Sequence, residues 1–184
     1  MILEIVQYGH PALRAKGRRI EVVDDEIRQL ADDMLDTMYD ADGVGLAAQQ
    51  IGMPLQMCVI DVTGVEDRPS VLRINGLAVD IEDNMPLVLL NPDVELLGKE
   101  ETGPEGCLSF PGVRGDITRP YSVRVTAKSL DGDDIEFEAD GLLARAVQHE
   151  HDHLHGILFI DRMNPKEKKS IQAEIDEIMR LNAP

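Results

Sequence analysis

The chain has few aromatic and few basic residues. Tryptophan is absent from its 184 residues, and phenylalanine and tyrosine occur 3 times each. The buried core must therefore be built from aliphatic side chains and methionine. Lysine and arginine number 18 against 35 aspartates and glutamates, which gives a net charge of −17. This charge excludes broad binding of nucleic acid through a basic surface, so we expect no DNA partner.

Long apolar runs and a basic leader are also missing. No run approaches the roughly 18 apolar residues needed to cross a bilayer, and the opening residues Met1 to Glu4 lack the positive charge of a signal peptide. The 2 cysteines, Cys58 and Cys107, indicate a reducing compartment and no disulfide. We therefore expect a cytoplasmic protein without a membrane partner. Because no repeat or linker interrupts it, the sequence predicts a single domain over residues 1–184.

The hydrophobic periodicity predicts an α+β fold. Helical spacing of apolar residues predicts helices over residues 24–39, 140–155 and 165–181. Strand-like stretches lie between the first two helices, at Gln56 to Val62, Ser70 to Ile74, Leu87 to Leu90, Ser122 to Ala127 and Ile135 to Glu138. We expect mainly antiparallel strands packed around the second helix, with the third helix at the C-terminus.

Turn-forming residues are expected to delimit these strands. Asn91-Pro92 and Asp131-Gly132 predict the ends of two strands. Residues 67–69 and 75–82 are rich in turn formers, so we expect a mobile hairpin insertion there.

A metal-ligand pattern lies within the second predicted helix. The motif HExxH begins at His149, and helical geometry aims His149 and His153 at one cation, with Glu150 in reach of a water beside it. This is the layout of a metal-dependent hydrolase. A second register, His151 and His155, competes for the same role. On a helical wheel these two histidines lie opposite the apolar face, so we interpret them as solvated side chains.

A third protein ligand is needed beside the two histidines. Cys107 lies in the sequence Glu105 to Ser109, which glycines and prolines flank, so we expect it in a loop or short strand. Taken alone, Cys107 would be interpreted as a buried structural thiol. The HExxH motif favours ligation instead. Cys58 lies in a β-like apolar run, and we interpret it as a core residue.

Three motifs together resemble the peptide deformylase family. Residues 43–50, GVGLAAQQ, meet the family pattern GxGLAAxQ, and Glu105 to Ser109 meet EGCLS in full. Residues 149–156, HEHDHLHG, meet HExDHLxG. The resemblance extends over nearly the whole chain. One departure is His151, where the family usually carries an apolar or aromatic residue.

The resemblance implies a metallohydrolase that removes the N-formyl group from the formyl-methionine of newly synthesised polypeptides and releases formate. The implied metal ligands are Cys107, His149 and His153. The resemblance points to Fe²⁺ in cells, with Zn²⁺, Ni²⁺ or Co²⁺ as replacements, because this ligand set suits several cations. Activity is then expected to be sensitive to oxygen.

The resemblance also implies the catalytic roles. Glu150 would take a proton from the water on the cation as that water attacks the formyl carbonyl, and would then protonate the leaving amine. The Gln50 side-chain amide and the Leu108 backbone N–H would donate to the oxyanion. Gly45 would contact the extended substrate through its main chain.

A pocket for the methionine side chain is expected one helical turn before His149. Leu142 and Ala146 are the candidates to line it, together with Val44. We expect Arg145 at the rim of the pocket. Arg114 is interpreted as a solvated arginine, with contact to the peptide backbone as the alternative.

The implied partners are N-formylmethionyl nascent peptides, with a transient ribosome contact. The basic residues that would serve this contact are Lys166, Lys168, Lys169 and Arg180. The same segment has apolar residues at helical spacing, so we favour an amphipathic helix that packs on its own domain.

Three other functions compete with deformylation. An HExxH peptidase would usually take its third ligand downstream, from a histidine or a glutamate, whereas Cys107 lies upstream. A non-catalytic metal-binding module would require a blocked coordination position or the absence of Glu150. The third alternative is a deformylase relative that is inactive or is specialised for other N-formyl or N-acyl compounds. The intact motif residues argue against inactivity, whereas Arg145 leaves altered specificity open.

Overall fold

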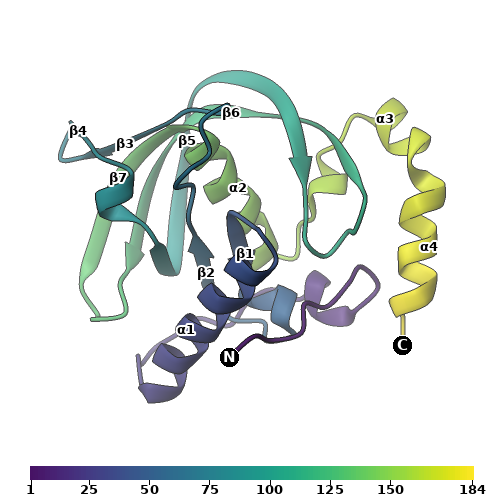
Figure 1. Cartoon of the computed structure of the whole chain (residues 1–184), viewed down its shortest axis with the longest axis horizontal. Helices are drawn as coiled ribbons and strands as arrows, with labels where there is room; N and C mark the ends of the chain where they lie inside the picture. The colour runs from purple at the N-terminus through teal and green to yellow at the C-terminus, as the bar shows by residue number, and fades with distance from the viewer.

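The computed structural model describes residues 1–184, and a single curved sheet of seven strands dominates it (Figure 1). All neighbouring strands pair antiparallel, in the order β1-β2-β5-β6-β7-β3-β4. The strands are β1 (Gly45–Ala47), β2 (Met57–Ile60), β3 (Ser70–Ile74), β4 (Leu77–Val79), β5 (Leu87–Gly106), β6 (Arg114–Lys128) and β7 (Asp134–Gly141). The α+β class and the antiparallel pairing that the sequence predicts are confirmed.

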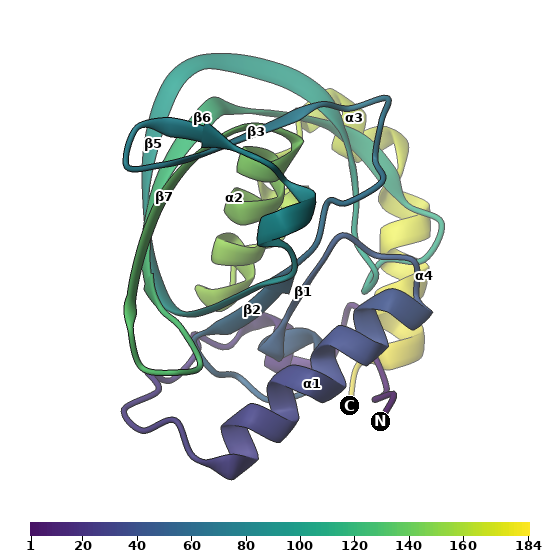
Figure 2. The same ribbon diagram turned by 60° about the vertical axis from the view of Figure 1, so that its left-hand side comes forward.

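The helices lie on both sides of this sheet. They are α1 (Asp25–Asp40), α2 (Leu142–Leu154), α3 (Pro165–Ser170) and α4 (Gln172–Asn182), with short 3₁₀ turns η1 (Pro11–Arg14), η2 (Ala48–Ile51), η3 (Glu82–Asn84) and η4 (Phe159–Asp161). Figure 2 shows α2 enclosed by the curved sheet, whereas α1 lies outside, next to β1 and β2. None of the helices has both the length and the apolar character that a bilayer crossing requires.

The central helix α2 is buried on nearly every side. Leu143 and Val147 pack into the main hydrophobic cluster, as the apolar face predicts. Ala144 and Gln148 are also buried, at 0% and 5% exposure, although they lie on the face that was expected to be solvated. The face of α2 opposite its apolar side is therefore not solvated in the first turns of the helix, because the curved sheet covers it. Only the C-terminal end of that face, at His155, is exposed.

The strands β5 and β6 are much longer than the sequence predicts. The turn signal Asn91-Pro92 was expected to end a strand, and this prediction is wrong, because β5 continues to Gly106. Asn91 has φ of 51° and the register between β5 and β6 shifts between Leu90 and Asp93. A β-bulge therefore absorbs the proline that would otherwise interrupt the ladder. The predicted stop at Asp131-Gly132 lies in the turn between β6 and β7.

The predicted hairpin insertion is formed by β3 and β4. Asn75 and Gly76 connect the two strands with φ of 54° and 78°. Two successive positive φ values produce the tight turn whose twist matches paired strands. β3 also pairs with β7, so the hairpin extends the sheet at the edge next to the N-terminus of α2.

The C-terminal segment contains two helices where one was expected. The break is at Ile171, whose N–H bonds to the carbonyl of Lys168 instead of continuing the α-helical pattern. Ile175 and Ile178 of α4 are buried in a cluster with Leu13 of η1. The prediction that this amphipathic segment packs on its own chain is confirmed. α4 lies at the opposite end of the molecule from the β3–β4 hairpin (Figure 1).

Candidate active site

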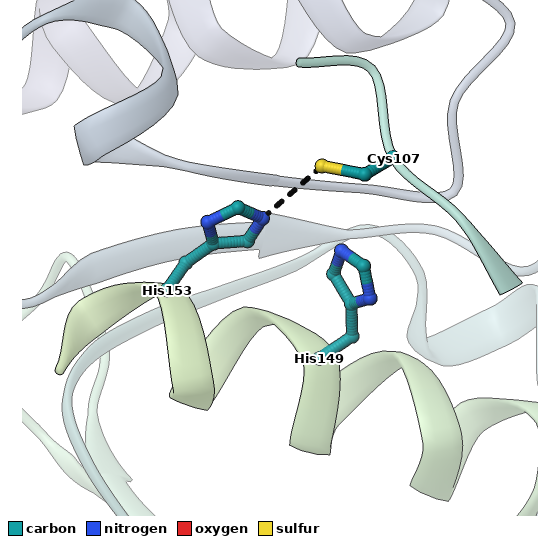
Figure 3. A group of neighbouring side chains, drawn as sticks. All are labelled: Cys107, His149 and His153. Atoms are coloured by element: carbon teal, nitrogen blue, oxygen red, sulfur yellow. Dashed lines mark hydrogen bonds between the residues drawn. The ribbon is translucent and has the colours of Figure 1, made fainter. Parts of the chain in front are cut away.

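Three side chains converge where the β5–β6 connection passes α2. Cys107 follows the last residue of β5, and His149 and His153 are one turn apart on α2. The Sγ atom of Cys107 is 3.4 Å from Nε2 of His153, and one ligand atom from each of the three residues lies within 4.8 Å of the others. Figure 3 shows both imidazoles directed from the helix toward the sulfur. The structure therefore brings together the three residues that were predicted as metal ligands.

A buried carboxylate holds His149 from the side opposite Cys107. Glu105 Oε1 is 2.9 Å from His149 Nδ1. Arg119 donates to both oxygens of Glu105, at 2.6 and 3.0 Å, and Arg145 donates to Oε2 at 2.8 Å. Burial raises the pKa of Glu105, but hydrogen bonds from His149 and Arg119 outweigh it and hold the pKa well below its usual range. Glu105 is therefore a fixed anion, and it leaves Nε2 of His149 to face Cys107.

The network behind the histidines continues beyond Glu105. Asp152 accepts from Arg119 at 3.0 Å and from Arg162 at 2.7 and 2.8 Å. This role of Arg119, Asp152 and Arg162 was not predicted from the sequence. A signal was present, because Arg119 follows Ile117 at the two-residue spacing of side chains on one face of a strand, and both are buried. An arginine at an inward strand position requires buried anions as partners.

Arg145 was expected at the rim of the pocket, but the structure places its guanidinium elsewhere. Its side chain is buried, and besides Glu105 it donates to the backbone carbonyls of Ile117 and Glu101, each at 2.8 Å. The guanidinium thus joins α2 to β5 and β6. Part of the side chain still lines the cavity.

Glu150 is buried beside the three converging side chains. Its Oε2 atom has no hydrogen-bond partner in the protein. Burial raises the pKa of Glu150 to about 7, although the neighbouring His149 lowers it. A Cβ added at Gly45 would lie 2.5 Å from Oε1 of Glu150. β1 therefore needs glycine at this position so that the carboxylate can occupy its place.

The residues present fit a divalent cation. Thiolate and imidazole are ligands of Zn²⁺ and Fe²⁺. Burial lowers the pKa of His149, but its hydrogen bonds to Cys107 and Glu105 and the charge of Glu150 raise the pKa well above its ordinary value. The surroundings thus favour a positive charge at this point, which a cation would supply in place of a proton. For His153, burial and the charge of His149 lower the pKa, so its imidazole is neutral, as ligation requires.

Two hydrogen-bond donors lie next to Cys107. The Gln50 amide accepts from the Ala47 N–H at 3.0 Å, which fixes Nε2 at 3.5 Å from Cys107 Sγ and 3.3 Å from Ser109 Oγ. The backbone N–H of Leu108 has no acceptor within the protein. Gln50 and Leu108 both line the cavity in front of the histidines. They come from η2 and from the β5–β6 connection, which only the fold places side by side.

A cavity of about 580 Å³ adjoins these groups. The four residues that were expected to contact substrate, Val44, Gly45, Leu142 and Ala146, all line it. Arg114 also lines the cavity and is exposed, without an ion-pair partner. Arg68 and Phe110 also line the cavity and were not predicted to do so. Arg68 lies outside every motif, whereas Phe110 directly follows Ser109 of the EGCLS motif. Cys58 is buried in the core at 1% exposure, as predicted.

Known proteins that are similar to this chain in sequence and in fold carry the same description. The family model described as polypeptide deformylase matches residues 2–169. The peptide deformylase of Methylacidiphilum infernorum is 47% identical over 100% of this chain and 96% of its own length. A crystal structure of a peptide deformylase from Legionella pneumophila has a TM-score of 0.82 at 35% identity and covers 98% of this chain and 97% of its own.

A further solved relative carries a ligand. The peptide deformylase from Synechococcus elongatus, crystallised in complex with actinonin, has a TM-score of 0.78 at 40% identity, with 97% of this chain and 86% of its own covered. These matches extend over nearly the whole chain and agree with the geometry of the site. The chain therefore belongs to the peptide deformylase family.

Proposed function

We propose that this chain, as a single catalytic domain of residues 1–184, removes the formyl group from N-formylmethionyl nascent peptides at the site formed by Cys107, His149, Glu150 and His153. The observation that carries the proposal is the unpartnered, buried carboxylate of Glu150 next to the three converging ligand atoms. When bound, a divalent cation supplies a Lewis acid that lowers the pKa of water toward neutrality. The other steps follow from the side chains of the chain itself.

Glu150 is the proton carrier of the proposed reaction. With a pKa of about 7, its carboxylate accepts a proton from the attacking water at neutral pH and returns it to the amine nitrogen as the C–N bond breaks. The products are formate and a peptide with a free amino terminus. Because Oε2 forms no hydrogen bond within the protein, it is available for this transfer.

Gln50 and Leu108 are the proposed oxyanion donors. The hydrogen bond to Ala47 N–H orients the Gln50 amide with its NH₂ toward the site, and the Leu108 N–H is uncommitted. As the formyl carbon becomes tetrahedral, its oxygen gains negative charge that fixed donors stabilise. Because both donors are held in place before the reaction, they need not reorient as the charge develops, whereas solvent molecules would.

The cavity supports the methionine specificity. Leu142, Ala146 and Val44 supply apolar wall on the side of α2 and β1, which suits an unbranched thioether. The main chain at Gly45 is open to an extended peptide because no Cβ shields it. We place the enzyme in the cytoplasm with its formylated substrates. The proposed ribosome contact is made by the basic residues of α3 and α4, namely Lys166, Lys168, Lys169 and Arg180.

Fe²⁺ is the proposed resident cation, with Zn²⁺, Ni²⁺ and Co²⁺ as replacements. The Cys107, His149 and His153 set accepts each of them. A cysteine that ligates an iron open to solvent is exposed to oxidation. Anaerobic purification with metal analysis tests this choice: iron should predominate, and the Fe²⁺ form should lose activity in air faster than the Ni²⁺ form.

The deciding experiment measures formate release from formyl-Met-Ala-Ser by protein loaded anaerobically with Fe²⁺ or Ni²⁺. Acetyl-Met-Ala-Ser and Met-Ala-Ser serve as parallel substrates, because a broader deacylase would cleave the first and a peptidase the second. Glu150→Gln, with its cation content verified, is the catalytic control. The proposal is supported if the parent releases formate from formyl-Met-Ala-Ser, leaves the two parallel substrates intact, and loses most of this activity in Glu150→Gln. Hydrolysis of the acetyl peptide at a similar rate, or no turnover at full cation occupancy, would overturn it.

Actinonin provides an independent check on the cavity. The relative from Synechococcus elongatus was crystallised in complex with this compound. If the cavity of this chain has the proposed role, actinonin should compete with formyl-Met-Ala-Ser. Uncompetitive inhibition, or none, would contradict the assignment of the cavity.

A further inference from the structure

Two histidines of α2 take no part in the proposed reaction. His151 lies in the last turn of the helix, and His155 is its C-terminal cap. Their ring centroids are 4.5 Å apart, closer than the 5.0 Å between the rings of His149 and His153. Since successive side chains turn by about 100° around a helix, this second pair lies on a different side from the first. The structure thus contains two pairs of neighbouring histidine rings on different sides of α2.

The hydrogen bond of His155 determines its tautomer. Nδ1 of His155 is 2.9 Å from the backbone carbonyl of His151. A carbonyl oxygen can only accept, so Nδ1 carries the proton and donates it. The lone pair of the neutral ring is therefore on Nε2, which is the atom that a cation binds. The ring of His151 forms no hydrogen bond with the protein, so both of its nitrogens are uncommitted.

Exposure and the helix end also favour a cation here. His155 is exposed and His151 is half-buried, so a hydrated ion can reach the pair from solvent. The carbonyl groups at the C-terminus of a helix carry partial negative charge that attracts cations. Asp152 lies between the two histidines in sequence but is bound by Arg119 and Arg162. Water must therefore complete the coordination.

We propose that His151 and His155 form a second divalent-cation site, separate from the catalytic one, that binds Zn²⁺, Ni²⁺ or Cu²⁺ through one imidazole nitrogen from each residue. Two imidazoles four residues apart on a helix are a recurrent metal-binding arrangement. Because the affinity of nitrogen ligands rises from Fe²⁺ to Ni²⁺ and Cu²⁺, this site discriminates against iron. It lacks a thiolate and a buried carboxylate such as Glu150, so it is a binding site without hydrolytic chemistry.

Occupancy of this site has a structural consequence. The cation would join the last turn of α2 to the residue that caps it. A ligand that binds only the folded state stabilises the protein in proportion to the logarithm of its concentration. Zn²⁺ added beyond one equivalent should therefore raise the melting temperature of the parent chain.

The test is a calorimetric titration with Zn²⁺ of protein that already holds one equivalent at the catalytic site. The parent should bind a second, weaker equivalent. His151→Gln and His155→Gln should each weaken that step by about tenfold or more, since even loss of an outer partner of a metal ligand costs roughly 10–100-fold. His10→Gln is the matched control, because His10 has no second histidine near it, and it should leave the second step unchanged. Ca²⁺, which prefers oxygen ligands, serves to measure binding by surface carboxylates.

A second measurement keeps the outcome clear if one variant is destabilised. Retention of the untagged chain on immobilised Ni²⁺ should depend on both histidines, whereas deformylation by the variants should match the parent. The proposal is overturned if the parent takes up no second equivalent of Zn²⁺. It is also overturned if both single variants keep the second step and the retention.

Discussion

Glu105 joins the metal-ligand helix to a buried arginine: Oε1 of Glu105 lies 2.9 Å from Nδ1 of His149, and Nε of Arg119 donates to Oε2 at 2.6 Å. The side chains of Glu105 and Arg119 are 6% and 3% exposed, so water cannot replace either partner. The orientation of His149 therefore depends on a carboxylate that lies 44 residues before it in sequence.

Replacing Glu105 by glutamine should destabilise the protein and weaken cation binding. The variant leaves Arg119 and Arg145 without their buried anion, which typically costs about 3–5 kcal/mol of unfolding free energy. Loss of the partner of a ligating histidine should weaken cation affinity by about 10–100-fold. Denaturant melts and cation titrations measure the two effects.

The matched control for Glu105 is Glu95→Gln. Glu95 also pairs with an arginine, Arg124, at 2.9 Å, but its side chain is 59% exposed. An exposed pair contributes about 0–1 kcal/mol. If both variants lose the same unfolding free energy and the same cation affinity, the burial of Glu105 has no special role.

The stability of the chain should fall in acid, partly through Glu105. Its pKa in the folded state is depressed below the ordinary value of 4.5, so its stabilising contribution is present above 4.5 and is lost as the pH falls toward the folded pKa. Denaturant melts at neutral pH and below pH 4.5 give the unfolding free energy at each pH. The free energy lost between the two pH values should be smaller for Glu105→Gln than for the parent. An equal loss in both would assign the acid sensitivity to other carboxylates.

Activity should decline below a pH of about 7, the pKa to which burial raises Glu150. The carboxylate must be ionised to accept a proton, so the active fraction falls about tenfold for each unit of pH below the pKa. The kcat/KM profile of the parent checks this. Glu150→Gln should lose about 10²–10⁴-fold in activity, and its residual activity should lack this acid limb. Persistence of the limb in the variant would assign it to a different group.

Gly45→Ala should impair catalysis through the position of Glu150. The added Cβ would lie 2.5 Å from Glu150 Oε1, so the carboxylate must move. A displacement of about 1 Å in an active site can cost about 100-fold in rate. Gly103→Ala is the control, because its Cβ would meet Arg145 at an ordinary 3.5 Å. If both variants react at the rate of the parent, the close approach of β1 to Glu150 is not required.

Gln50→Met should lower kcat by about 10²–10³-fold, as expected for the loss of one oxyanion donor, with a smaller change in KM. Gln49→Met is the control, because Gln49 is equally buried but its Nε2 is 3.5 Å from the Ala15 carbonyl, with no contact to Cys107. Both variants lose a buried amide, so both should melt earlier. A kcat that falls equally in both would argue for a structural role of Gln50.

The spacing of residues along the sequence is enough to predict several helices and part of the site. Helical periodicity is a property of neighbouring residues, so the sequence predicts α1, α2 and the pairing of His149 with His153. The same holds for the amphipathic C-terminal segment. The bulge at Asn91-Pro92 escaped prediction because pairing with β6 outweighs the local preference of proline to end a strand.

Only the tertiary structure decided how the motifs meet. Cys107 and His153 are 46 residues apart in sequence, yet Sγ and Nε2 are 3.4 Å apart because the end of β5 crosses the helix. Arg145 was expected at a pocket rim and is buried instead, because the sheet curls around α2 and supplies Glu105 as its partner. The sequence determined the chemical groups through short-range periodicity and motif spacing. Their distances, burial and pKa values follow from contacts between distant segments, which no local pattern encodes.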